Sequence, residues 1–166
     1  MARTEGTNGP ADMRPGEVAV PLPEHADAAI YFIGRIRTPW PTRSACPKRG
    51  DPVTGPACAI EVDDPWRPAL RAIGRHPRLQ ILYWMHLARR DLVLQNPRSD
   101  GVLIGTFAIR SPVRPNPIAS SLVTVIGLEE SRLLVRGLDC VDGTPLLDIK
   151  PEHCLAAGSE AAAAMP

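Results

Sequence analysis

Nineteen prolines spread along a chain of 166 residues limit its fold more than any other feature. Each proline fixes φ and removes a backbone donor, so long helices and central strands cannot contain many of them. Short strands joined by stiff loops satisfy this restriction. The sequence therefore predicts a mostly β protein, and its length suffices to bury one sizeable core.

Apolar runs separated by turn signals mark the expected strands. These runs lie at residues 30–36, 58–62, 80–87, 102–109, 122–126 and 133–138. The runs at 80–87 and 102–109 are nearly continuous, as in strands covered on both sides. The last two flank a polar stretch and predict an antiparallel hairpin. One short helix is expected from Pro65 to Ile73, because an acid precedes a proline at its start.

The composition changes along the chain and predicts three parts. Residues 1–28 are rich in proline, glycine and acids and are expected to form a flexible acidic arm. Residues 29–152 form the expected single domain, and the alanine-rich stretch 153–166 is expected to be a flexible tail. No run of eighteen apolar residues occurs, and the polar start lacks a secretory layout, so a cytoplasmic protein without a membrane partner is expected.

The charge is unevenly distributed, although the formal net charge is only +1. From residue 28 onward there are 17 basic residues and 13 acidic ones. This excess suits RNA binding but is also compatible with a small-molecule ligand. Residues 28–50 contain no acid and include Trp40, and Arg67, Arg71 and Arg75 recur at helical spacing. Both stretches are candidates for gripping phosphates, or for ordinary solvated surface.

The four cysteines form no CxxC pair; they are Cys46, Cys58, Cys140 and Cys154. Scattered reduced thiols are therefore expected, with no metal site. A metal protein would require tertiary clustering that this spacing does not indicate.

Residues 110–118 contain three prolines, two arginines and an asparagine. Arginine binds carboxylate or phosphate with two parallel hydrogen bonds, and a stiff loop loses little entropy on binding. The segment is thus a candidate ligand loop. The alternative is a rigid connection whose arginines pair with surface acids.

Residues 138–151 hold three acids and a lysine: Asp139, Asp142, Asp148 and Lys150. The carboxylates can accept a proton, and the lysine can stabilise developing negative charge. The Asp142–Pro145 stretch is also a strong turn signal. A purely structural turn is therefore the alternative.

In order and spacing, these two motifs resemble the TsaA-like family of tRNA threonylcarbamoyladenosine methyltransferases, whose signatures read TRSPxRPNPIGxS and DxxDGTPxLDIKP. The opening segment Ile33–Trp40 is similar to the family's IGxIxTPF, and residues 82–87 are similar to its LWxLFxFH region. The resemblance covers residues 30–151.

The resemblance implies a single compact β-barrel with one or two short helices. A Rossmann fold is not expected, and the sequence lacks a GxGxxG after its first strand. It further implies a homodimer that binds S-adenosylmethionine near its interface. The implied activity is N-methylation of threonylcarbamoyladenosine next to the anticodon, so tRNA is the expected partner and DNA is not.

The resemblance also carries over site positions. Those implied for cofactor binding are His86, Leu87, Arg110, Ser120, Gly143, Thr144, Pro145 and Leu146. Those implied for RNA or substrate binding are Lys48, Arg49, Arg114 and Asn116, of which the last two could instead brace their loop. For catalysis the candidates are Asp139, Asp142 and Lys150, with Asp148 as a further proton acceptor. His86 could instead be a satisfied histidine that ends a buried strand.

Three departures from the family pattern bear on function. Lys48–Arg49 stands where the family has Arg-Gln, which removes an amide acceptor and adds charge. Ala119 replaces a glycine, and the extra domain that follows the barrel in better-known bacterial members is expected to be absent. A non-catalytic S-adenosylmethionine-binding module, or a methyltransferase with another acceptor, is therefore the alternative function.

Overall fold

The computed structural model describes residues 13–130 and 132–153. They belong to two compact units. Unit 1 combines the residues up to 29 with residues 85–119. Unit 2 combines residues 30–84 with those from 120 onward. Of the expected C-terminal tail, only residue 153 is described, and Cys154 lies outside the described residues.

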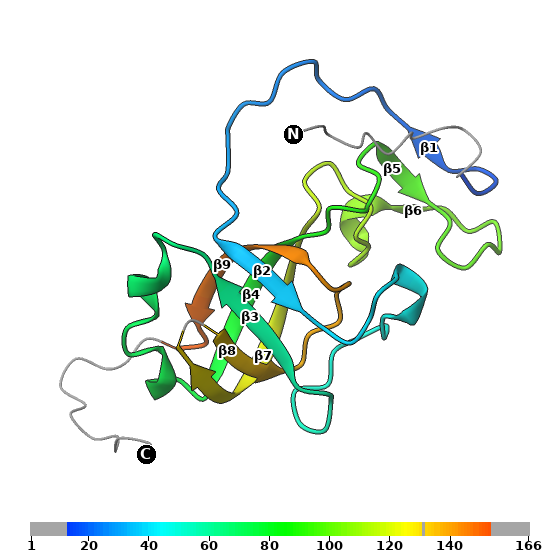
Figure 1. Cartoon of the computed structure of the whole chain (residues 1–166). Helices are drawn as coiled ribbons and strands as arrows, with labels where there is room; N and C mark the ends of the chain where they lie inside the picture. Colours follow the sequence, from blue (N-terminus) through cyan, green and yellow to red (C-terminus); the bar gives the residue numbers. More distant parts are fainter. Residues whose placement is uncertain (1–12, 131, 154–166) are drawn as a thin grey trace. The chain divides into compact units, whose positions relative to one another are not determined.

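Unit 2 contains a closed β-barrel whose strands are ordered β2-β3-β8-β7-β4-β9 (Figure 1). The strands are β2 (Gly34–Arg37), β3 (Cys58–Val62), β4 (Arg78–Trp84), β7 (Ile118–Glu129), β8 (Arg132–Arg136) and β9 (Thr144–Pro151). The first two residues of β7 belong to unit 1. The last strand, β9, pairs antiparallel with both β2 and β4 and so closes the barrel. The prediction of a mostly β, non-Rossmann barrel is confirmed.

Alternating burial along the strands forms the barrel core. On β4, Leu79, Ile81 and Tyr83 are at most 2% exposed, while the intervening Gln80 is exposed. This period of two places alternate side chains on opposite sides of the sheet. The other fully buried core residues of the strands are Ile36, Ile60, Val123, Leu133, Val135 and Leu146.

Close backbone approach between β2 and β3 requires a glycine at the start of β2. A Cβ added at Gly34 would lie 2.0 Å from the carbonyl oxygen of Glu61, which is far inside contact distance. Glu61 belongs to the paired strand β3. Any side chain at residue 34 would therefore push the two strands apart.

Unit 1 contains a three-stranded sheet ordered β1-β5-β6. Its strands are β1 (Val18–Ala19), β5 (Leu92–Gln95) and β6 (Ile104–Gly105), followed by the 3₁₀ helix η5 (Thr106–Ala108). The amide of the buried Gln95 donates to Thr106 Oγ1 and to the Val113 carbonyl, both at 2.8 Å. β1 comes from the stretch that the sequence analysis assigns to the acidic arm, and residues 1–12 of that arm lie outside the described range.

Two of the predicted elements are wrong. The expected helix at 65–73 is replaced by two 3₁₀ helices, η3 (Arg67–Leu70) and η4 (Ile73–Arg75), because Ala72 between them has a left-handed φ of 67°. The arginines spaced along this stretch therefore share no continuous helix face. The expected covered strand at 102–109 shrinks to β6, because the chain turns into η5, where Phe107 is 82% exposed.

The remaining predictions hold in part. The strand at 58–62 and the hairpin are confirmed, since β7 and β8 pair antiparallel. The strand expected at 30–36 begins only at Gly34. A further 3₁₀ helix, η2, covers Arg43–Ala45. Within residues 13–130 and 132–153, no helix is long and apolar enough to cross a membrane.

Candidate functional site

The residues that the sequence analysis assigns to the site are divided between the two units. Unit 1 holds His86, Leu87, Arg110, Arg114 and Asn116. Unit 2 holds Lys48, Arg49, Ser120, Asp139, Asp142, Gly143, Thr144, Pro145, Leu146, Asp148 and Lys150.

In unit 1, Arg114 braces the proline-rich loop from within. Its Nη2 donates to the Ile109 carbonyl at 2.6 Å, and its Nε donates to the Ser111 carbonyl at 2.9 Å. These bonds hold the first half of the loop in one conformation. The geometry therefore favours the bracing role that the sequence analysis left open for Arg114.

The segment that follows β4 is fastened to the second half of the same loop. The backbone N–H of Met85 donates to the Pro117 carbonyl at 2.8 Å, and Arg90 Nε donates to the Pro115 carbonyl at 2.6 Å. His86 and Leu87 lie between these two attachments and are exposed. Because β4 ends at Trp84, His86 is not a histidine that ends a buried strand. Exposed Asn116 lies between the two acceptor prolines, so unit 1 brings these three candidates together.

In unit 2, the turn before β9 is built largely from hydrogen bonds within the barrel. The Gly143 N–H donates to the Ile36 carbonyl at 2.8 Å, and the Thr144 N–H donates to the Val141 carbonyl at 3.2 Å. The carboxylate of Asp142 accepts the Thr38 N–H at 3.1 Å. Asp142 thus has the structural role that the sequence analysis weighed against a catalytic one.

The same turn still presents one accessible surface. Gly143 has a left-handed φ of 77°, and a Cβ added there would meet nothing within 4 Å. Thr144, Pro145 and Leu146 are buried. A ligand at this turn would therefore contact Gly143 and not the backbone N–H groups, which already have acceptors.

Asp139 belongs to a hydrogen-bond network that the sequence analysis missed. The Tyr83 hydroxyl donates to Asp139 Oδ1 at 2.7 Å and lies 2.8 Å from Ser121 Oγ. Burial, and secondarily the Asp139 charge, raise the pKa of Tyr83. Tyr83 and Ser121 lie on neighbouring strands of the barrel. Nothing in their local sequence signals a role, because hydroxyl residues are common in strands.

Lys150 and Ser120 lie on the outer surface of the barrel. Ser120 Oγ accepts a hydrogen bond from Gln80 Nε2 at 2.9 Å, and Gln80 is the register partner of Lys150. Lys150 Nζ lies 2.6 Å from Asp148 Oδ2, and this hydrogen bond raises the pKa of Lys150. The acid that pairs with Lys150 is therefore Asp148. Asp139 lies elsewhere, in contact with the inward-facing Tyr83.

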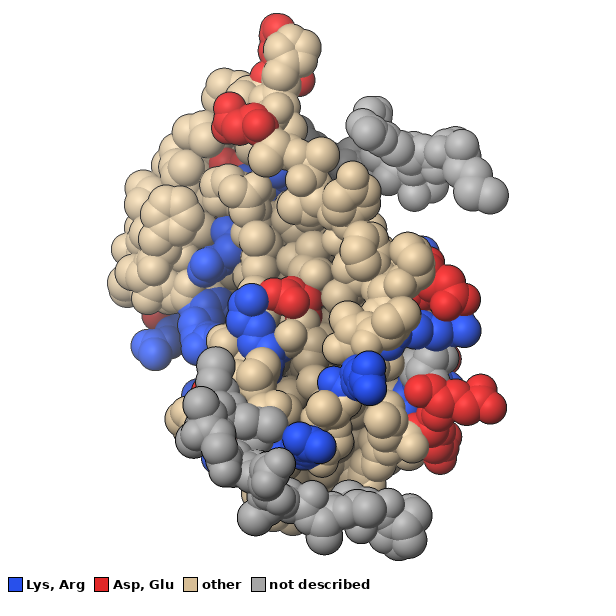
Figure 2. Space-filling view, turned by 90° about the vertical axis from the view of Figure 1, so that its left-hand side faces the viewer, with Lys and Arg blue, Asp and Glu red and all other residues tan. Residues whose placement is uncertain are grey.

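The loop that carries Lys48 and Arg49 lies beside the segment leading to Asp139. A Cβ added at Gly50 would be 1.9 Å from the Gly137 carbonyl oxygen, so the two backbones touch. Lys48 and Arg49 are both exposed. On the side of the molecule drawn in Figure 2, basic side chains occur at several separate places. The basic surface is therefore not confined to this loop.

The barrel cysteines are reduced and largely inaccessible. Burial raises the pKa of Cys58 to about 11 and that of Cys140 to about 12. Burial, followed by the Asp139 charge, also raises the pKa of the half-buried Cys46. Across residues 13–130 and 132–153, no three His, Cys, Asp or Glu side chains gather as a possible metal site.

The fold and these residues define a small closed β-barrel domain of non-Rossmann type, with polar residues at its turns and on its outer surface. Residues 35–154 match the tRNA-methyltransferase O N-terminal domain family, and the chain belongs to this family.

Relatives support this assignment. A probable S-adenosyl-L-methionine-binding protein, VirR of Rhizobium radiobacter, is 51% identical over 143 residues, which cover 86% of this chain and 81% of VirR. An S-adenosyl-L-methionine-binding protein of Archaeoglobus fulgidus is 36% identical, with 71% of this chain and 84% of that protein covered. The crystal structure of TrmO from Pseudomonas aeruginosa matches with a TM-score of 0.62 at 31% identity. That match covers 86% of this chain but only 62% of the TrmO chain.

Proposed function

We propose that this protein is an S-adenosylmethionine-dependent methyltransferase that N-methylates threonylcarbamoyladenosine next to the anticodon of tRNA. The observation that carries the proposal is the family match over residues 35–154, which includes both motifs. The S-adenosylmethionine-binding relatives add support for the cofactor.

The residues proposed for the cofactor are chemically suited to it. Exposed Arg110 can pair with a carboxylate, and exposed Leu87 offers an apolar contact. The open surface at Gly143 leaves room for a flat group. His86 and Ser120 complete the proposed contacts, and the buried residues 144–146 are proposed to hold the turn that presents Gly143. When bound, S-adenosylmethionine supplies the methyl group, whose bond to sulfur breaks as the bond to nitrogen forms.

We place the proton acceptor at Asp139, with Asp142 and Lys150 in supporting roles. Methylation of a nitrogen requires the loss of its proton, and a carboxylate within hydrogen-bond reach can take it. Tyr83 fixes Asp139 through Oδ1 alone. Asp142 is engaged with the Thr38 backbone, and Lys150 is paired with Asp148. Lys48, Arg49 and Asn116 are proposed to contact the RNA, and Arg114 to hold the loop.

Transfer of labelled methyl from S-adenosylmethionine to total tRNA of cells lacking this protein tests the proposal. The expected result is label in threonylcarbamoyladenosine of a subset of tRNAs, strongly reduced by Arg110→Ala. Arg98→Ala is the matched control, because Arg98 is also an exposed arginine of unit 1 and should leave transfer unchanged. Label in another base or in no RNA would contradict the proposal.

A cofactor-binding protein without methyl transfer is the second candidate. The replacement of the family's glutamine by Arg49 favours it, because an amide acceptor is lost at a proposed RNA contact. It predicts S-adenosylmethionine binding by calorimetry with no labelled RNA.

We also propose a cytoplasmic homodimer. The aromatic segment before β2 supports self-association, since Tyr31 and Phe32 are 76% and 48% exposed. Sedimentation velocity should give twice the chain mass, and a Tyr31→Ser, Phe32→Ser variant should shift it toward the monomer.

A further inference from the structure

Arginines dominate the outer surface of three neighbouring barrel strands, β2, β3 and β8. The inward residues Ile36, Ile60, Leu133 and Val135 are completely buried, so the residues between them face outward. The outward residues are Arg35, Arg37, Ala59, Glu61, Arg132, Leu134 and Arg136. We call this surface the arginine face. It carries four guanidinium groups and one carboxylate.

Strand register places that carboxylate between the arginines. Glu61 is the partner of Arg35 on β2 and of Arg132 on β8. Its Oε2 lies 2.7 Å from Arg37 Nε, and its Oε1 lies 3.5 Å from Arg132 Nε. Asp142, from the turn before β9, reaches Arg37 only at 3.8 Å. The acids therefore offset only part of the positive charge.

Protein acceptors orient the arginines without using all their donors. Arg35 Nη1 donates to the Gly143 carbonyl at 3.2 Å, and Arg136 Nη1 donates to the Gly55 carbonyl. The side chains of Arg37 and Arg132 remain 45% and 50% exposed. A guanidinium has five N–H donors in a rigid fork, so each keeps donors for a further anion.

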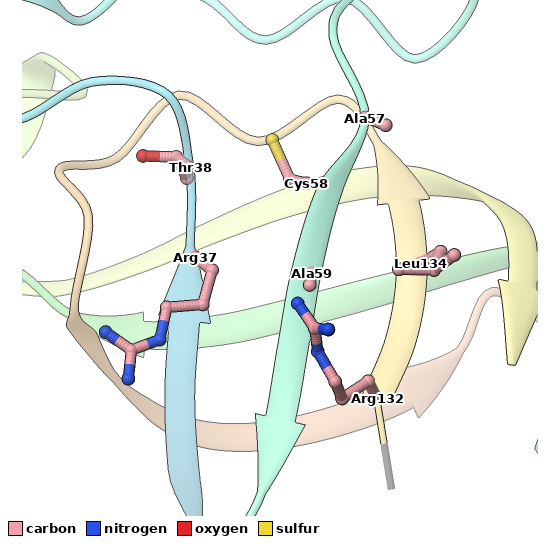
Figure 3. A pocket seen from close by; sticks show the side chains of 7 residues that line it. All are labelled: Arg37, Thr38, Ala57, Cys58, Ala59, Arg132 and Leu134. Atoms are coloured by element: carbon pink, nitrogen blue, oxygen red, sulfur yellow. The ribbon is translucent and has the colours of Figure 1, made fainter. Parts of the chain in front are cut away.

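A hollow of about 260 Å³ lies in the middle of the arginine face. Its floor includes Ala57 and Ala59, whose small side chains leave the space open. Arg37 and Arg132 line it from the strands on either side of Ala59 (Figure 3). A water occupies roughly 30 Å³ in the liquid, so the hollow has room for a phosphate with part of its sugar.

We propose that the arginine face binds the phosphate backbone of the RNA that this protein methylates. The proposal rests on the proposed function for the presence of RNA. Paired guanidinium forks match phosphate oxygens, and Leu134 is the one large apolar side chain among the outward residues, which does not suit an apolar protein partner. Contacts of this kind position an RNA without reading its sequence.

Fluorescence anisotropy with end-labelled total tRNA and the full chain, over a series of NaCl concentrations, tests this. Arg132→Gln should weaken binding about three- to tenfold and reduce the slope of log K against log[salt] by about 0.7 to 0.9. Glu61→Gln should tighten binding, because it removes the one acid of the face and releases Arg37 and Arg132. Ala59→Leu changes no charge but fills the hollow, and it should also weaken binding.

Arg78→Gln is the matched control. Arg78 lies on β4, outside the arginine face; its side chain is 46% exposed and forms an ion pair with Glu152 at 3.2 Å. Its replacement should leave affinity within twofold of the original. Thermal unfolding of each variant checks the fold, and a gain of affinity in Glu61→Gln cannot come from misfolding.

Methyl transfer measured in parallel separates this inference from the proposed function. Active enzyme whose tRNA affinity is unchanged by Arg132→Gln, Glu61→Gln and Ala59→Leu would overturn the inference alone. Equal losses of tRNA affinity in Arg132→Gln and Arg78→Gln would also overturn it, because they would mean that any positive charge on the surface contributes equally to binding. Variants that shift tRNA affinity as expected, in a protein that transfers no methyl, would support the arginine face and contradict the methyltransferase.

Discussion

Asp139 and Asp142 are three residues apart but have different surroundings. Asp139 accepts a hydrogen bond from a buried tyrosine, whereas Asp142 accepts the backbone N–H of Thr38. One carboxylate is joined to the barrel interior, and the other closes a turn. Both residues lie in the connection between β8 and β9, and the tertiary structure determines which residues from distant segments meet each side chain.

Replacing Tyr83 by Phe should lower the free energy of unfolding by about 1 to 3 kcal/mol. The change removes only the hydroxyl, so Asp139 loses the hydrogen bond from Tyr83 at 2.7 Å and keeps the longer one from Ser121 Oγ at 3.4 Å. Urea denaturation measures the effect. Tyr31→Phe is the control, since Tyr31 is 76% exposed, and it should have little effect. Equal stability of the two variants would show that the network contributes nothing.

Cys140 should make the protein less stable at alkaline pH. Its pKa is raised from 9.0 to about 12, so the folded state holds the thiol proton more tightly than the unfolded chain does. The contribution of the Cys140 thiol to the free energy of unfolding is complete below pH 9. It falls as the pH rises toward 12, by up to about 1.4 kcal/mol per pH unit. Chemical denaturation at pH 8 and pH 10 should show a smaller loss for Cys140→Ala than for the original chain.

Among the elements, regular strands could be predicted and irregular ones could not. The apolar run around Ile60 and the polar stretch between β7 and β8 are local signals, so the sequence contains them. The apolar run at 102–109 gives a similar local signal, but the buried hydrogen bond between Thr106 and Gln95 holds the chain in a turn there. The motif loops could be identified as candidate sites, but the arginine face requires the register of three strands distant in sequence.

Gly34→Ala should destabilise the barrel far more than Gly127→Ala. The Cβ at residue 34 would overlap the Glu61 carbonyl and separate β2 from β3, at a cost of about 2 to 4 kcal/mol. At Gly127 on β7, the added Cβ would meet the flexible Leu134 side chain at 3.4 Å. Thermal unfolding compares the two variants. Similar melting temperatures would mean that the backbone can move apart at little cost.

At the scale of the whole molecule, different interactions stabilise each of the two units from within. Unit 2 has a closed barrel with a continuous apolar core. Unit 1 has a sheet with two strands of only two residues, and buried polar contacts of Gln95, Asn96 and Thr106. Closed sheets leave no edge open, whereas short strands open easily.

Hydrogen exchange followed by mass spectrometry should therefore distinguish the units. Peptides containing β4 and β8 are expected to exchange only on global unfolding. Those containing β1 and β6 should exchange faster by at least about tenfold, which corresponds to about 1.4 kcal/mol. Exchange at one common rate would indicate a single cooperative body.

The position of β9 has a consequence for synthesis. It pairs with β2 and β4, and residues 34 and 146 become neighbours only when β9 has formed. While the ribosome is still adding the preceding residues, the nascent barrel has two unpaired strand edges. Such edges attract other chains, and contacts between residues so far apart form slowly. The newly made chain should thus be open to pairing with other chains until β9 has formed.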